Sequence, residues 1–146
     1  MSLEQFSLRL AAAIVAGFII GFERQWQYKT TGLRTHALVA VGAASYVLIS
    51  VGLTGGGEGD VTRIIGQVVV GVGFLGGGVI MRDGLNVQGL NSAASIWCSS
   101  AIGCLAGAGF FPELAVATLA VVLINLGFRP VDEFLANRKN KKKDSK

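Results

Sequence analysis

Charged residues are scarce in this chain of 146 residues, because Asp, Glu, Lys and Arg together make up only 15% of it. Soluble domains contain about 25% of these residues. Hydrophobic residues account for 51% of the chain, and the mean hydropathy is +0.57. Too few polar side chains remain to cover a surface that faces water, which excludes an ordinary soluble domain. The composition predicts an all-α polytopic membrane protein.

Histidine and cysteine are also scarce. His36 is the only histidine, which excludes a His-rich metal site. Cys98 and Cys104 share one apolar segment at a spacing that points them to different faces of a helix, so we interpret them as buried thiols. The sequence offers no Ser-His-Asp, Cys-His or paired-acid arrangement. We therefore expect no enzyme, no catalytic residues, no cofactor and no metal ligands.

Five apolar segments are expected as membrane spans, although the fifth is short against the roughly 20 residues usually needed. They are residues 3–22, 35–53, 64–81, 90–111 and 114–128. Residues 54–63 are glycine-rich and are predicted to form a loop rather than a helix. Asp83-Gly84 is a turn signal between the third and fourth spans. We expect a transmembrane domain over residues 1–128 and a basic tail over residues 129–146.

The distribution of basic residues predicts the orientation of these spans. With five spans, 11 of the 13 Lys and Arg residues fall in the loop 23–34, the turn near Asp83 and the tail, and only Arg9 and Arg63 fall on the other side. The positive-inside rule then places the N-terminus outside and the tail in the cytoplasm. A basic tail also attracts anionic lipid, at about 1 kcal/mol per residue. We expect no nucleic-acid partner.

Glycine is abundant, with 21 residues. Pairs spaced four apart allow helices to approach closely. These pairs are Gly17 with Gly21, Gly73 with Gly77, and Gly103 with Gly107. They offer more packing faces than five helices obviously need, so we expect a homo-oligomer, most simply a dimer.

An offset of 57 residues aligns Gly32-Leu33 with Gly89-Leu90 and Thr35 with Ser92. One interpretation is that spans one-two and three-four are parallel helix-hairpin repeats, followed by a fifth helix. The other is convergence of two helices that are both rich in small residues. The sequence leaves both open.

Polar residues gather where the spans meet the predicted cytoplasmic loops. They are Glu23, Arg24, Arg34, Thr35, His36, Arg82, Asp83, Asn91 and Ser92. Charges at membrane depth are costly unless paired, and they are often functional. We therefore treat these residues as one candidate polar cluster, with Glu23 and Asp83 as carboxylates against Arg24, Arg34 and Arg82. In this cluster Asp83 would pair with Arg34 or Arg24 from the other hairpin. The alternative is that each is a headgroup anchor, a cap or a turn residue.

Gln67 lies deeper, within the third span. A lone amide at that depth more often joins helices than binds a substrate.

Four motifs occur in a recognisable order: Gly21-Phe-Glu-Arg-Gln25, Gly32-Leu-Arg-Thr-His-Ala-Leu38, Gly71-Val-Gly-Phe-Leu-Gly-Gly-Gly-Val-Ile80 and Gly89-Leu-Asn-Ser-Ala-Ala94. Together they resemble the MgtC/SapB family of bacterial inner-membrane proteins, whose membrane domain is helical. The resemblance covers nearly the whole chain. Family members also carry a cytoplasmic ACT-like domain, and we expect only the membrane domain here.

The resemblance implies a virulence-associated regulatory protein that supports intracellular survival and growth when magnesium is scarce. Such members are thought to restrain the F-type ATP synthase, so the implied partner is another membrane complex. The competing hypothesis is a small ion or solute transporter or channel, which the repeat and the converging polar ends favour.

Overall fold

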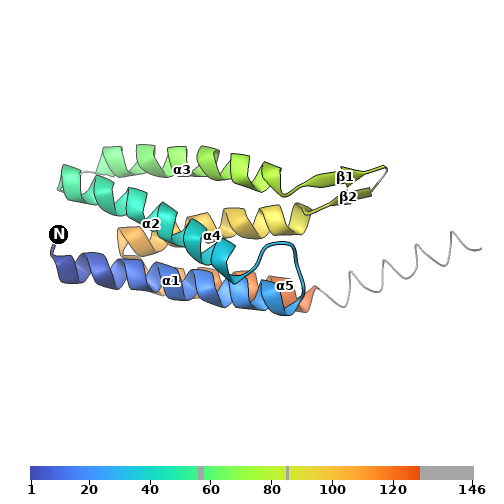
Figure 1. Ribbon diagram of the computed structural model, residues 1–146. Helices are drawn as coiled ribbons and strands as arrows, with labels where there is room; N and C mark the ends of the chain where they lie inside the picture. Colours follow the sequence, from blue (N-terminus) through green and yellow to red (C-terminus); the bar gives the residue numbers. More distant parts are fainter. Residues whose placement is uncertain (56–57, 85, 129–146) are drawn as a thin grey trace, which may run out of the picture.

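The computed structural model describes residues 1–55, 58–84 and 86–128, and this part of the chain folds into a helical bundle with one small β-hairpin (Figure 1). The elements are α1 (Leu3–Trp26), α2 (Leu33–Thr54), α3 (Glu58–Gly78), β1 (Met81–Asp83), β2 (Asn86–Gln88), α4 (Leu90–Ala108) and α5 (Phe111–Gly127). The predicted all-α polytopic class is confirmed. Among the described residues, α1, α2 and Val61–Gly78 of α3 are long and apolar enough to cross a membrane, and α5 is a shorter apolar helix.

Consecutive helices run in alternate directions (Figure 1). The α1–α2 loop, the β-hairpin and the C-terminal end of α5 all lie at one end of the bundle, which we call the hairpin end. The N-terminus and the α4–α5 turn lie at the opposite end. Among the described basic residues, Arg24, Lys29, Arg34 and Arg82 lie at this end. Which side of the membrane the hairpin end faces stays a prediction.

Small residues set the distance between the central helices. A Cβ added to Gly17 of α1 would lie 2.8 Å from the carbonyl oxygen of His36, and one added to Gly21 would lie 2.6 Å from the Cα of Leu33. Gly103 and Gly107 of α4 face the backbone of α2 just as closely. Helices α1 and α4 therefore pack backbone to backbone against α2.

Two glycines of α3, Gly73 and Gly77, behave differently. No heavy atom lies within 4 Å of a Cβ added to Gly73 or Gly77. These two glycines, which the sequence groups with the packing residues, face away from the rest of the described chain.

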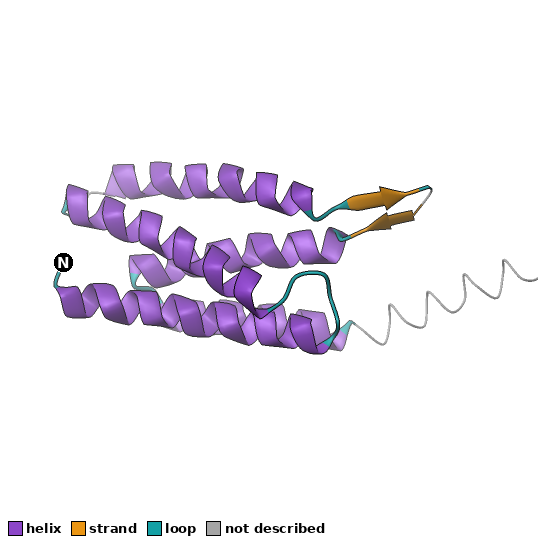
Figure 2. Cartoon of the chain, in the orientation of Figure 1, coloured by secondary structure: helices purple, strands orange, loops and turns teal. Residues whose placement is uncertain are grey.

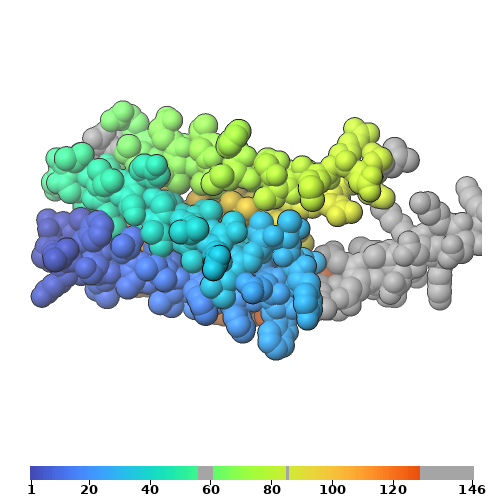
Figure 3. Space-filling model, viewed as in Figure 1, coloured from blue at the N-terminus to red at the C-terminus, as the bar shows by residue number. Residues whose placement is uncertain are grey.

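Two apolar clusters share α2 and α4 as their common wall. The first joins α1, α2, α4 and α5 and includes Ile20, Ile102 and Leu114. The second joins α2, α3 and α4 and includes Val47 and Val72. Side chains outside these clusters are largely apolar and exposed, as expected for helices whose outer faces meet lipid. Figure 3 shows α1, α2 and α3 side by side on one face of the molecule.

Several boundaries differ from the prediction, and α3 and the turn that follows it show the clearest differences. Helix α3 begins at Glu58, inside the segment 54–63 that was predicted to be a loop. The predicted turn at Asp83-Gly84 exists, but it belongs to an antiparallel β-hairpin in which Arg82 pairs with Val87.

The proposed repeat agrees with the arrangement of the helices. Helices α1 and α3 run in one direction, and α2 and α4 run in the other (Figure 1). Gly32 and Gly89, which the 57-residue offset aligns, are the N-cap residues of α2 and α4 respectively.

Candidate functional site

Glu23 and Arg24 lie in the last turns of α1, at the hairpin end of the bundle. Helix α1 continues to Trp26, so both residues are helical rather than part of the predicted loop. Their side chains are 7% and 1% exposed, respectively. An adjacent acid and base are thus removed from solvent at the end of an otherwise apolar helix, where each needs a polar partner.

Glu23 finds its partners on two segments. The side-chain amide of Asn125 on α5 donates to Oε2 of Glu23 at 3.0 Å, and that of Gln27 donates to Oε1. The carboxylate therefore ties the end of α1 to the end of α5. Sequence reasoning missed both amides. Asn125 could have been noticed as a lone amide in the fifth apolar segment.

Arg24 is the least satisfied polar group at this end. Its Nε and Nη2 atoms are buried and have no hydrogen-bond partner among the described residues. The guanidinium interacts electrostatically with Glu23 and with the His36 ring. Nε–H and Nη2–H form the edge that arginine presents to a bidentate acceptor. A buried guanidinium with two unsatisfied donors is destabilising, so Arg24 lowers the stability of this end of the bundle.

His36 connects α2 to α4 and to the α1–α2 loop. The ring is fully buried, with Nδ1 2.8 Å from Oγ of Ser99 and Nε2 3.3 Å from Oγ1 of Thr31. Ser99 has a single hydroxyl proton, which it donates to the carbonyl of Ser95. Nδ1–H of His36 is therefore the donor to Ser99, and in a neutral ring Nε2 can accept from Thr31. The sequence predicts His36 as a site residue, but its partners Thr31 and Ser99 were missed.

The structure does not bring all nine predicted site residues together. Glu23, Arg24, His36 and Ser92 are buried, and Thr35 is half-buried, whereas Arg34 and Asn91 are exposed at the starts of their helices. Arg82 and Asp83 are exposed on β1, which extends beyond the bundle (Figure 2).

The Asp83–arginine pair is not present in this structure. Asp83 forms no ion pair with any described residue, while Nε of Arg82 donates to the carbonyl of Gly84 at 3.0 Å. Gly84 has φ of 59°, a conformation that favours glycine. The short hairpin carries both charges away from α1, so Asp83 occupies the position of a turn residue.

Comparison with known proteins decides the family. The family model described as "MgtC family" matches residues 10–134. The chain belongs to the MgtC family. "Protein MgtC" of Brucella abortus (strain 2308) is 48% identical over 126 residues, covering 86% of this chain and 52% of that protein. "Protein MgtC" of Salmonella typhimurium (strain LT2) is 47% identical over 129 residues, covering 88% and 54%.

An uncharacterized protein of Synechocystis is 47% identical over 135 residues, covering 92% of this chain and 57% of that protein. This MgtC family member thus spans about half the length of the curated relatives it matches. No solved structure matches it. Family membership, together with the apolar helices, identifies it as a membrane protein and confirms the resemblance drawn from the four motifs.

Proposed function

We propose that this chain is an MgtC-type regulatory protein of the bacterial inner membrane, which supports growth at low magnesium and intracellular survival through contact with a membrane complex such as the F-type ATP synthase. The observation that carries the proposal is the family match over residues 10–134, which includes nearly all of the helical bundle. Relatives named MgtC match over the same bundle at 47–48% identity.

The hairpin end supplies a physical basis for such a role. Glu23 holds α1 to α5 through Asn125, and His36 holds α2 to α4 through Ser99. These two connections hold α1 to α5 and α2 to α4 at the end where the loops emerge. A partner that contacts this end meets a preformed surface, which lowers the entropic penalty of association.

Complementation tests the proposal. The chain is expressed in a bacterium that lacks its own MgtC, and growth at limiting magnesium is compared with growth at ample magnesium. We expect restored growth at limiting magnesium only, together with co-purification of ATP synthase subunits from native nanodiscs. The variant Glu23→Gln should restore growth less well, whereas Glu113→Gln, at an exposed position on α5, should act like the wild type. Failure to restore growth at equal membrane levels would overturn the proposal.

The orientation is part of the same proposal, with the N-terminus outside and the hairpin end in the cytoplasm. Single cysteines at Gly55 and Gly84 mark the two ends of the bundle, and both positions are exposed. With Cys98 and Cys104 replaced by alanine, we expect an impermeant thiol reagent added to intact cells to label Gly55→Cys and not Gly84→Cys. The reverse labelling pattern would overturn the orientation.

A transporter or channel is the second candidate. It is favoured by the parallel arrangement of the α1–α2 and α3–α4 hairpins, with Gly32 and Gly89 as matching N-caps. Ion flux into liposomes containing the purified chain separates the two candidates. Flux above that of protein-free liposomes supports transport, and growth restoration without flux supports regulation.

A further inference from the structure

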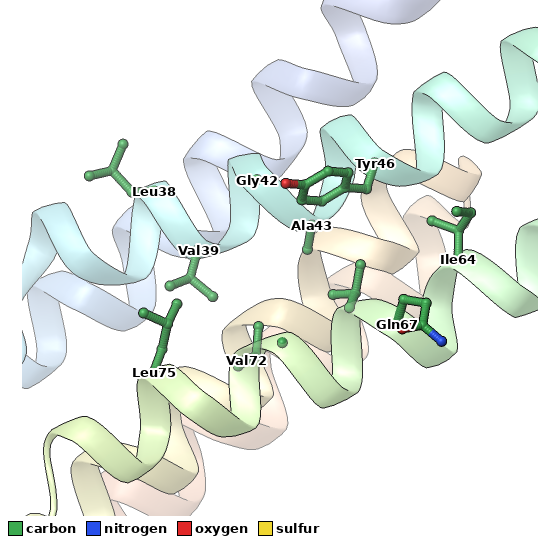
Figure 4. A pocket seen from close by; sticks show the side chains of 11 residues that line it. Leu38, Val39, Gly42, Ala43, Tyr46, Ile64, Gln67, Val72 and Leu75 are labelled. Carbon is green, nitrogen blue, oxygen red and sulfur yellow. The ribbon is translucent and has the colours of Figure 1, made fainter.

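A groove separates α2 from α3 on the open side of the bundle. It has a volume of about 610 Å³, and its rims are formed by Gly42 and Tyr46 of α2 and by Gln67 and Gly71 of α3. Figure 4 shows Val39 of α2 and Val72 and Leu75 of α3 pointing into the space between the two helices. The groove lies along the membrane-spanning part of both helices, so whatever fills it is itself in the membrane.

Gln67 is the polar exception in this apolar groove. Its side chain is exposed, lies near the middle of α3 and forms no hydrogen bond with any described residue. Several hydroxyls elsewhere in the bundle donate to a carbonyl of their own helix, as Ser45 does to Val41 and Thr118 does to Leu114. An amide left unpaired against hydrocarbon is costly. Gln67 therefore requires a partner that reaches the same depth.

The face of α3 around Gln67 is shaped for close approach by another helix. Gln67, Gly71 and Phe74 follow a spacing of four and then three residues, which places them in one stripe. Phe74 is 85% exposed, while Cβ atoms added to Gly71 or to the nearby Gly73 would meet no atom within 4 Å. A large projecting ring beside bare backbone provides both a knob and a hole on one surface.

We propose that a second copy of this chain docks here, with the two α3 helices side by side and their Gln67 amides hydrogen-bonded to each other. Two copies inserted in the same orientation are related by an axis along the membrane normal, so each residue meets its own equivalent at the same depth. A residue that meets its own equivalent can hydrogen-bond to it only if its side chain is both a donor and an acceptor. The primary amide of Gln67 is both.

The knob and the hole fit the same arrangement. Phe74 of each copy lies against the glycine backbone of the other copy's α3, close to the symmetry axis. An acyl chain would fill the groove but leave Gln67 unpaired. A different protein's helix would need its own polar residue at this depth. This inference does not depend on the proposed regulatory role.

Disulfide trapping tests the interface directly. In a background with Cys98 and Cys104 replaced by alanine, native membranes containing Gln67→Cys are treated with copper phenanthroline. We expect a covalent dimer from Gln67→Cys and little from Leu119→Cys, a matched control at an exposed position near the middle of α5. Equal cross-linking at both positions, or none at Gln67→Cys, would overturn the proposal.

A second measurement separates the contribution of the Gln67 amide to dimerisation from that of close helix approach. The monomer–dimer equilibrium is followed in lipid bilayers by single-molecule photobleaching. Gln67→Leu preserves the approximate size but removes the hydrogen bond, so dimerisation should weaken by about threefold to thirtyfold. Gln67→Asn should retain part of the affinity, and Gly71→Leu should abolish dimers by blocking close approach. A protein that remains monomeric, or a Gln67→Leu variant that dimerises like the wild type, would overturn the proposal.

A photoreactive side chain at position 67 then identifies the occupant. Cross-linking to a second copy supports the proposal. Cross-linking mainly to lipid or to a different protein overturns it.

Discussion

Helices α1 and α3 both contain glycines spaced four residues apart, yet the two helices use these glycines in opposite ways. Gly17 and Gly21 bring the backbone of α1 against that of α2, whereas Gly73 and Gly77 of α3 have no neighbour within 4 Å of an added Cβ in the described part of the chain. The polar end of the first hairpin is buried around Arg24, and that of the second extends into an exposed β-ribbon. Glycine spacing thus predicts that a helix can be approached closely, but it does not identify the neighbour.

Adding one methyl group to a closely packed glycine and to an open glycine tests this contrast and should give the largest effect. In Gly103→Ala, the new Cβ would clash with the backbone carbonyl of Ala40, which cannot move without shifting α2. We expect destabilisation by about 3 kcal/mol or more. Gly73→Ala adds a methyl group in open space and gains helix propensity, so it should be neutral or stabilising by up to about 1 kcal/mol.

Thermal unfolding of both variants in the same detergent measures the difference. Cys104→Ser is a suitable reference for mild perturbation of the same helix. If Gly103→Ala and Gly73→Ala unfold at the same temperature, the contrast between closed and open glycine faces is wrong.

A buried and an exposed carboxylate provide the next contrast. Glu23→Gln preserves shape but removes the negative charge beside Arg24, which leaves a buried cation without its counter-charge. We expect a loss of about 3 kcal/mol in the free energy of unfolding, since the buried charge of Arg24 then lacks a nearby negative charge. Glu113→Gln on the exposed start of α5 should change it by less than about 0.5 kcal/mol.

A double-mutant cycle that combines Glu23→Gln with Asn125→Ala shows whether the stability lost in Glu23→Gln depends on the hydrogen bond to α5. If Asn125 acts through Glu23, the double mutant should lose less stability than the two single mutants added together. Strictly additive losses would mean that the hydrogen bond between Asn125 and Glu23 contributes nothing to stability.

Sequence reasoning succeeded where the signal is local and failed where it depends on contacts between distant segments. Apolar length predicted the helices, and the Gly32 and Gly89 motifs marked the starts of α2 and α4. The β-hairpin was missed because three-residue strands exposed on both sides carry no alternation of apolar and polar residues. The partnership of Asn125 with Glu23 exists only because α5 lies beside α1, 102 residues away in sequence.

The smallest effect is expected at the exposed hairpin, where the sequence alone could not separate two roles for Asp83. The structure gives Asp83 no ionic partner among the described residues and places it next to Gly84 in a turn. Asn also favours turns, so Asp83→Asn should change the free energy of unfolding by less than about 0.5 kcal/mol. Gly84→Ala should cost about 1 kcal/mol, because alanine at φ of 59° is strained. Thermal unfolding checks both values, and growth at limiting magnesium adds the functional comparison. A large loss of stability in Asp83→Asn would reveal an ionic partner for this carboxylate. Impaired growth with unchanged stability and membrane level would instead assign Asp83 to a surface that another molecule contacts.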